Sequence, residues 1–84
     1  MKPYINKIPA DTLNFIRQNE DKLKIVSIAH NNTIHKVPFV EGIQLGIFVH
    51  MLRHLKIIGK NAASPKILAA NGFTIRDNLV FKNQ

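Results

Sequence analysis

One continuous stretch of the chain, residues 41–58, carries apolar side chains at the spacing of a single long helix. Placed at 100° per residue, these side chains cover an arc of about 200°. They are Leu45, Ile47, Phe48, Val49, Met51, Leu52, Leu55 and Ile58. A surface helix needs only a stripe facing the core, so this arc predicts a helix that is covered on more than one side. We therefore expect residues 41–58 to form the central core element, with Gly59 as the C-cap.

A β-hairpin is predicted before this helix. Residues 24–30 and 33–39 are rich in β-branched side chains, and Asn31-Asn32 separates them. Asparagine tolerates the positive φ angles of a two-residue hairpin turn. The resulting register places Val26 opposite Val37, so both side chains should face the same side of the hairpin.

Shorter elements are predicted nearer the two ends of the chain. A first helix should begin with Asp11 as its N-cap and end near Asp21. Ser64-Pro65 is typical of a helix start, which favours a short helix over residues 66–70, with a strand as the alternative. Residues 73–76 and 79–82 have the pattern of a closing hairpin around a turn at Asp77-Asn78.

The chain is predicted to be a single domain, residues 1–84, of the α+β class. Two hairpins and one broadly apolar helix indicate a small two-layer fold, in which an antiparallel sheet from both hairpins packs on the long central helix. A winged helix-turn-helix is the alternative, with the long and short helices joined across residues 59–61 and the closing hairpin as the wing. In that alternative the short helix offers only Lys66 and Asn71 as polar readers of a base.

The composition excludes several classes of protein. The chain has no cysteine, which excludes disulfides, thiolate chemistry and cysteine-ligated metals. It has no glycine-rich phosphate loop, paired-carboxylate site or serine-nucleophile motif, so we predict no cofactor and no catalytic residue. Residues 1–7 lack the apolar run of a secretion signal, and no segment supplies the roughly 20 apolar residues of a membrane span. We expect a cytoplasmic protein without a membrane partner.

Positive charge is concentrated in the second half of the chain. Residues 43–84 hold six basic residues against one acid, a net charge of +5, whereas residues 1–42 contribute +2 of the total of +7. The six cations are Arg53, Lys56, Lys60, Lys66, Arg76 and Lys82. Because a basic surface attracts polyanions, we expect nucleic acid, either DNA or RNA, as the partner.

The polar face of the long helix supplies further candidate residues. His50, Arg53 and His54 adjoin at i, i+3 and i+4, and the histidines add charge below about pH 6.5. Gly42 and Gly46 continue this strip, where another element, a second copy of the chain or a phosphate backbone could approach closely. The two histidines have the spacing of a shared metal site, but Arg53 would repel a cation, so no metal is predicted.

These features predict a small, basic, non-enzymatic protein that binds nucleic acid mainly through phosphates, as an accessory protein of a bacterium or mobile element. The alternative is an inhibitor or assembly factor that presents its basic face to an acidic protein. A homodimer would suit a chain this short. A small basic ribonuclease, with His50 and His54 as acid and base, is the third hypothesis.

Overall fold

The computed structural model describes residues 9–83. Its elements are α1 (Ala10–Gln18), a 3-10 helix η2 (Glu20–Lys22), β1 (Lys24–His30), β2 (Thr33–Phe39), β3 (Ile43–Gln44), α2 (Leu45–His54), α3 (Ser64–Ala70), β4 (Phe73–Arg76) and β5 (Leu79–Lys82). No helix within residues 9–83 is long and apolar enough to cross a membrane. Residues 1–7, on which the expectation about a secretion signal rests, lie outside the described part.

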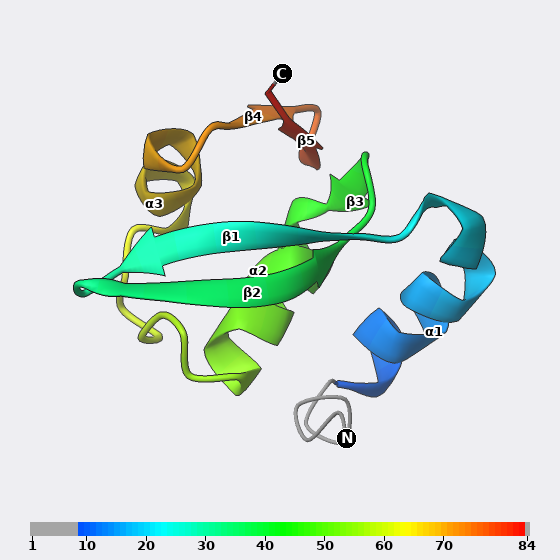
Figure 1. Ribbon diagram of the computed structural model, residues 1–84, viewed down its shortest axis with the longest axis horizontal. Coiled ribbons are helices and arrows are strands. Elements are labelled where there is room, and N and C mark those ends of the chain that lie inside the picture. Colours follow the sequence, from blue (N-terminus) through cyan, green and yellow to red (C-terminus); the bar gives the residue numbers. More distant parts are fainter. Residues whose placement is uncertain (1–8, 84) are drawn as a thin grey trace.

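The strands form two antiparallel sheets rather than one. Strand β1 pairs with β2, and β5 lies between β3 and β4 in a second sheet. The β1–β2 hairpin crosses one side of α2. Helix α3 and the second sheet lie together above the hairpin in this view (Figure 1). The predicted small α+β fold is therefore confirmed, with the difference that the two hairpins belong to separate sheets.

The turn residues of both hairpins have the conformation that the sequence predicts. Asn31 and Asn32 have φ angles of 52° and 62°, and Asp77 and Asn78 have φ angles of 52° and 63°. Positive φ at both central positions matches the right-handed twist of the flanking strands. The predicted register of the first hairpin is confirmed, since Val26 pairs with Val37.

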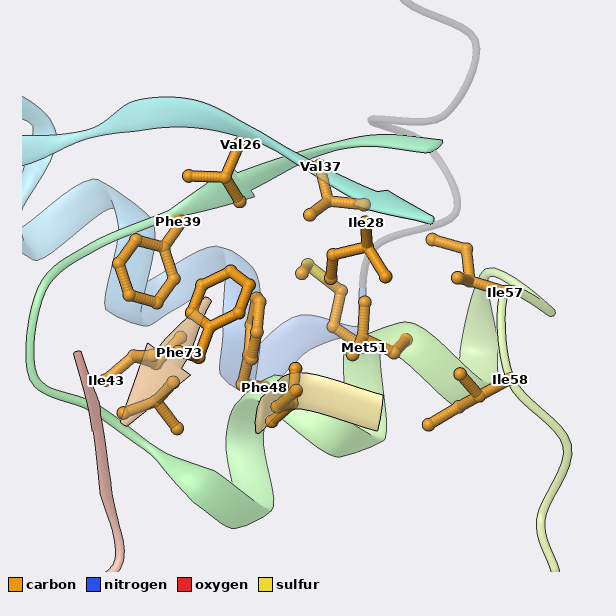
Figure 2. Packing of buried hydrophobic residues seen from close by; sticks show 13 residues of the cluster. Val26, Ile28, Val37, Phe39, Ile43, Phe48, Met51, Ile57, Ile58 and Phe73 are labelled. Carbon is orange, nitrogen blue, oxygen red and sulfur yellow. The ribbon is translucent and has the colours of Figure 1, made fainter. Parts of the chain in front are cut away.

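The apolar arc of α2 is buried from more than one direction, as predicted. Phe48, Met51 and Leu52 are completely buried. The β1–β2 hairpin supplies one cover, and the apolar side chains of its inner face point toward α2 (Figure 2). They are Val26, Ile28, Val37 and Phe39. Phe73, Val80 and Leu68 complete the core from the second sheet and α3.

Helix α2 is shorter at its start than the predicted range. Gly42 has a φ angle of 81°, and its N–H donates to the carbonyl of Val80 at 2.8 Å. This bond brings the next two residues alongside β5, where Ile43 pairs with Val80 and Gln44 with Leu79. Residues 41–44 are therefore not helical, because pairing with a strand distant in sequence outweighs their local helical pattern.

The end of α2 also lies before the predicted C-cap, Gly59. Lys56 adopts a φ angle of 62°, and its N–H donates to the carbonyl of Arg53 at 3.0 Å. The N–H of Ile57 then donates to the carbonyl of Leu52 at 2.9 Å. These two hydrogen bonds form a Schellman motif at the end of α2. In this motif the residue after the turn, here Ile57, normally makes an apolar contact with a residue of the last helical turn, here Leu52. Ile57 and Leu52 are both buried, so burial of Ile57 accounts for the early end.

The remaining helices agree with the predictions except at their caps. Helix α1 begins after Pro9, so Asp11 lies in the first turn rather than at the N-cap, where its Oδ1 accepts a hydrogen bond from the N–H of Thr12 at 2.8 Å. Residues 66–70 are helical, which rules out the strand alternative. Ser64 is the first residue of α3 and makes no capping hydrogen bond.

Asn71, directly after α3, ties this helix to the edge of the first sheet. Its side-chain Oδ1 accepts from the N–H of Ala29 at 2.8 Å, and its Nδ2 donates to the carbonyl of Ala29 at 3.2 Å and of Ile67 at 2.8 Å. The amide thus takes the place of one residue of a neighbouring strand, because its donor and acceptor match those of a backbone. This fixes α3 relative to the hairpin and leaves Asn71 unsuited to the base-reading role considered for it.

The second half of the molecule has the order of elements of the winged helix-turn-helix alternative. Strand β3, helices α2 and α3, and the β4–β5 hairpin follow one another, and β5 inserts between β3 and β4. The departure lies in the connection between the helices. It runs over residues 55–63, which is longer than the three to four or so residues of a helix-turn-helix.

The positive φ of Lys56 leads to a prediction about stability. A side chain in the left-handed region costs about 1 kcal/mol or more, whereas glycine adopts this region freely. Lys56→Gly should therefore raise the free energy of unfolding in urea by about 0.5–1 kcal/mol. Lys60→Gly is the matched control, because Lys60 is an exposed cation of the same connection without a positive φ. Equal effects of the two substitutions would contradict the prediction.

Candidate functional site

An open groove of about 690 Å³ lies between one face of α2, the start of α3 and the β4–β5 turn. Its lining residues are Gln44, Leu45, Gly46, Val49, Arg53, Ala62, Ala63, Ser64, Pro65, Asp77, Asn78 and Leu79. The volume lies within the range of ordinary ligand sites, roughly 300–1,000 Å³. Ser64 Oγ is buried at this junction and has no hydrogen-bond partner within residues 9–83. The groove therefore brings together three segments that lie far apart in the sequence.

The groove contains one positive and one negative side chain. Arg53 lies on α2, and Asp77 lies on the β4–β5 turn; both are exposed. Within residues 9–83, Lys24 pairs with Glu41, and the His50 imidazole lies beside the carboxylate of Asp11, so the guanidinium and the carboxylate of the groove take part in no ion pair. Arg53 keeps its five N–H donors available for an anion, while Asp77 opposes an anion in the same groove.

Two more of the predicted cations adjoin the groove in sequence. Lys66 directly follows the lining residue Pro65, and Arg76 directly precedes Asp77. Lys56 and Lys60 lie on the connection between α2 and α3, and both are exposed. Arg53 therefore lines the groove, whereas Lys66 and Arg76 are neighbours in sequence of residues that line two other walls.

Lys82 differs from the other predicted cations because it is half-buried. Its ammonium lies 5.4 Å from the centre of the Phe73 ring. Its backbone N–H donates to Oε1 of Glu41 at 2.8 Å. The ammonium of Lys82 covers a core ring, and a carboxylate lies beside this residue. Lys82 is therefore the least suited of the six cations to contact a partner.

The aromatic rings of the closing hairpin are not free to stack on bases. Phe73 is 3% exposed and packs against Phe39 and Phe48, with ring centres 5.2 Å and 5.8 Å away. Phe81 is half-buried, and the guanidinium of Arg76 lies 4.9 Å from its ring centre. The core needs the Phe73 ring, so this ring offers no stacking surface to a base.

The histidines of α2 are exposed and lie close together. The ring centres of His50 and His54 are 6.3 Å apart, edge to face. Nδ1 of His50 lies 3.5 Å from Oδ2 of Asp11, so this imidazole contacts α1 whereas Arg53 lines the groove. Within residues 9–83, no three His, Asp or Glu side chains are placed to share a metal ion.

Gly42 and Gly46 do not form one helical strip, in contrast to the prediction. Gly42 precedes α2 and has a positive φ angle at the turn into β3. A Cβ atom at this position would lie 3.7 Å from the Phe81 ring. Gly46 lies in α2 and lines the groove, and a Cβ there would meet nothing within 4 Å. No element of the described chain packs on Gly46, so its missing side chain widens the groove instead.

Glu41 links the two sheets beside Lys82. Its Oε2 accepts a hydrogen bond from Nζ of Lys24 at 2.6 Å, while its Oε1 holds the N–H of Lys82. Partial burial acts to raise the pKa of Glu41, but the hydrogen bonds from Lys24 and Lys82 and the charges of both lysines leave the pKa below its usual value. The carboxylate therefore stays ionised and offsets positive charge at this end of β5.

Sequence reasoning missed the wall of the groove that the β4–β5 turn supplies. The sequence identifies Asp77 and Asn78 only as residues of a hairpin turn, and its apolar pattern places Gln44 in a helix. These residues meet because Gln44 pairs with Leu79, and the N–H of Leu45 donates to the carbonyl of Asn78 at 2.7 Å. A two-residue strand such as β3 gives no recognisable sequence signal, so the pairing could not be anticipated.

The chain matches no protein-family model, and neither a curated protein nor a solved structure is significantly similar to it.

The lowered pKa of Glu41 predicts a pH-dependent contribution to stability. Both partners are more than one-third exposed, so E41Q should lower the free energy of unfolding at pH 7 by only about 0.5–1 kcal/mol. Because the folded pKa is depressed, this contribution is present above the unfolded pKa of about 4.3 and is lost as the pH falls through the folded pKa. The free energies of unfolding of wild type and E41Q in urea should therefore converge as the pH falls below the folded pKa of Glu41.

Glu20→Gln is the control for this measurement, since Glu20 is an exposed carboxylate of η2. It should change the free energy of unfolding by less than about 0.5 kcal/mol. A difference between wild type and E41Q that persists unchanged at low pH would contradict the role given to the carboxylate charge.

Proposed function

We propose that this protein binds nucleic acid mainly through its phosphates, at the groove between α2, α3 and the β4–β5 turn. The observation that carries the proposal is the exposed guanidinium of Arg53 on the wall of an open groove, with Lys66 and Arg76 next in sequence to residues that line two other walls. A guanidinium in this position can hold a phosphate through two parallel N–H donors. The protein acts as a binding module rather than as an enzyme.

The charge of the whole chain supports the same partner. A net charge of +7 on 84 residues attracts a polyanion over distances comparable to the Debye length. The exposed cations Lys56 and Lys60 add to the attraction without lining the groove. Because binding of this kind releases counterions from the nucleic acid, affinity should fall steeply with salt and depend little on base sequence.

The opposite charges of Arg53 and Asp77 provide a direct test. Arg53→Gln should weaken binding to a labelled oligonucleotide and lower the slope of log K against log salt by about one. Asp77→Asn should strengthen binding, because it removes a carboxylate from the groove that receives the phosphate. Fluorescence anisotropy with a duplex and a single strand at two salt concentrations measures both effects.

Matched controls separate the groove from the overall charge. Arg17→Gln on α1 and Asp21→Asn in η2 make the same charge changes at exposed positions outside the groove. They should change affinity less than their counterparts in the groove. Absence of binding at low salt to both the duplex and the single strand would overturn the proposal, and equal effects of groove and control variants would overturn the assigned position.

An acidic protein partner is the second candidate, and one observation favours it. The outer face of the β1–β2 hairpin exposes large apolar side chains, with Ile25 55% and Ile34 68% exposed. Both side chains lie on the same face of the hairpin, where they would add apolar area to a protein contact. A partner retained on the immobilised protein after nuclease digestion, and lost with Ile34→Ser, would support this function. Complete release by nuclease would contradict it.

A further inference from the structure

We propose that the nucleic acid is double-stranded DNA, and that the exposed face of α3 enters its major groove. This inference rests on the proposed function and names its ligand more closely. The exposed face of α3 consists of Pro65, Lys66, Ala69 and Ala70. It begins at the groove, which Pro65 lines.

The phenylalanine rings argue against a single strand as the preferred ligand. Proteins that bind single strands present exposed rings on which successive bases stack. Within residues 9–83, Phe39, Phe48 and Phe73 are buried, whereas Phe15 and Phe81 are half-buried. Arg76 further covers the Phe81 ring. The described surface therefore offers phosphate contacts without a row of stacking rings, which suits a ligand whose bases are already paired.

Helix α3 is held firmly and presents small side chains to solvent. Leu68 is completely buried and Ile67 packs against the core, so the inner face of α3 is fixed. The amide of Asn71 fixes its end through two hydrogen bonds to Ala29. On the outer face, Ala69 allows the helix backbone to approach a ligand closely, because only a methyl group intervenes.

The shape of the double helix then decides between DNA and RNA. The major groove of B-form DNA is about 12 Å wide and admits an α-helix. The major groove of A-form RNA is too deep and narrow for side chains to read. A rigid helix with an exposed alanine face matches the former, where alanine can also contact the methyl group of thymine.

The protein groove between α2, α3 and the β4–β5 turn binds the DNA backbone that borders the major groove in which α3 lies. Lys66 is an exposed residue of α3 and directly follows Pro65, which lines the groove. A phosphate strand that runs along the groove beside α3 would meet the guanidinium of Arg53 on the wall formed by α2.

The experiment compares three labelled ligands of about 20 base pairs or nucleotides: a DNA duplex, its single strand and the RNA duplex of the same sequence. At equal salt the DNA duplex should bind at least about tenfold more tightly than the other two. Ala69→Glu should reduce affinity for the DNA duplex by about tenfold or more, since a carboxylate would face phosphates and base edges. Circular dichroism and thermal unfolding check that each variant is folded.

Gln18→Glu is the matched control, because it makes the same charge change at an exposed residue of α1. Helices α1 and α3 lie at opposite ends of the β1–β2 hairpin (Figure 1). The control should reduce affinity by no more than about threefold. Equal losses for the two variants, or equal or tighter binding of the single strand or RNA duplex, would overturn the inference while the proposed function stands. Failure of all three ligands to bind would overturn both.

Discussion

The rings of Phe39, Phe48 and Phe73 come from β2, α2 and β4 and pack together at the centre of the core. Phe39 lies edge to face against Phe48 and Phe73, with ring centres 5.3 Å and 5.2 Å away, while the rings of Phe48 and Phe73 are tilted at 5.8 Å. Each ring belongs to a different layer: the first hairpin, the central helix and the second sheet (Figure 2). In a chain of 84 residues, one such junction must join all layers, because there is no room for a second core. The positions of the exposed residues follow from this contact.

The apolar junction does not determine how the layers are rotated relative to one another. Polar contacts determine this rotation. Asn71 attaches the end of α3 to β1 at one end of the hairpin, and Glu41 attaches β5 to β1 at the other. Apolar packing is not directional, whereas these hydrogen bonds are. Each bond is worth little because it is exposed, so the ties orient the second sheet more than they stabilise it.

Local signals in the sequence were sufficient for the hairpins and for the existence of the helices. Asn31-Asn32 and Asp77-Asn78 determine their turns within a few residues, and burial of α2 follows from its own apolar arc. The predicted ends of α2 are wrong because contacts outside the helix determine them. The N–H of Gly42 donates to the carbonyl of Val80 instead of entering the helix, and burial of Ile57 ends it. For the same reason the candidate site was predicted only in part, since its walls meet through pairing between β3 and β5.

Net charge and contact surface are therefore different properties of this chain. The sequence places six cations in the second half, but folding turns Lys82 onto Phe73 beside Glu41 and sets Asp77 into the groove with Arg53. Long-range attraction depends on the total charge, whereas contact depends on the few cations that share a concave surface. Under the proposed function, the total charge would govern how fast the protein finds a polyanion, and the groove would govern where the polyanion is bound.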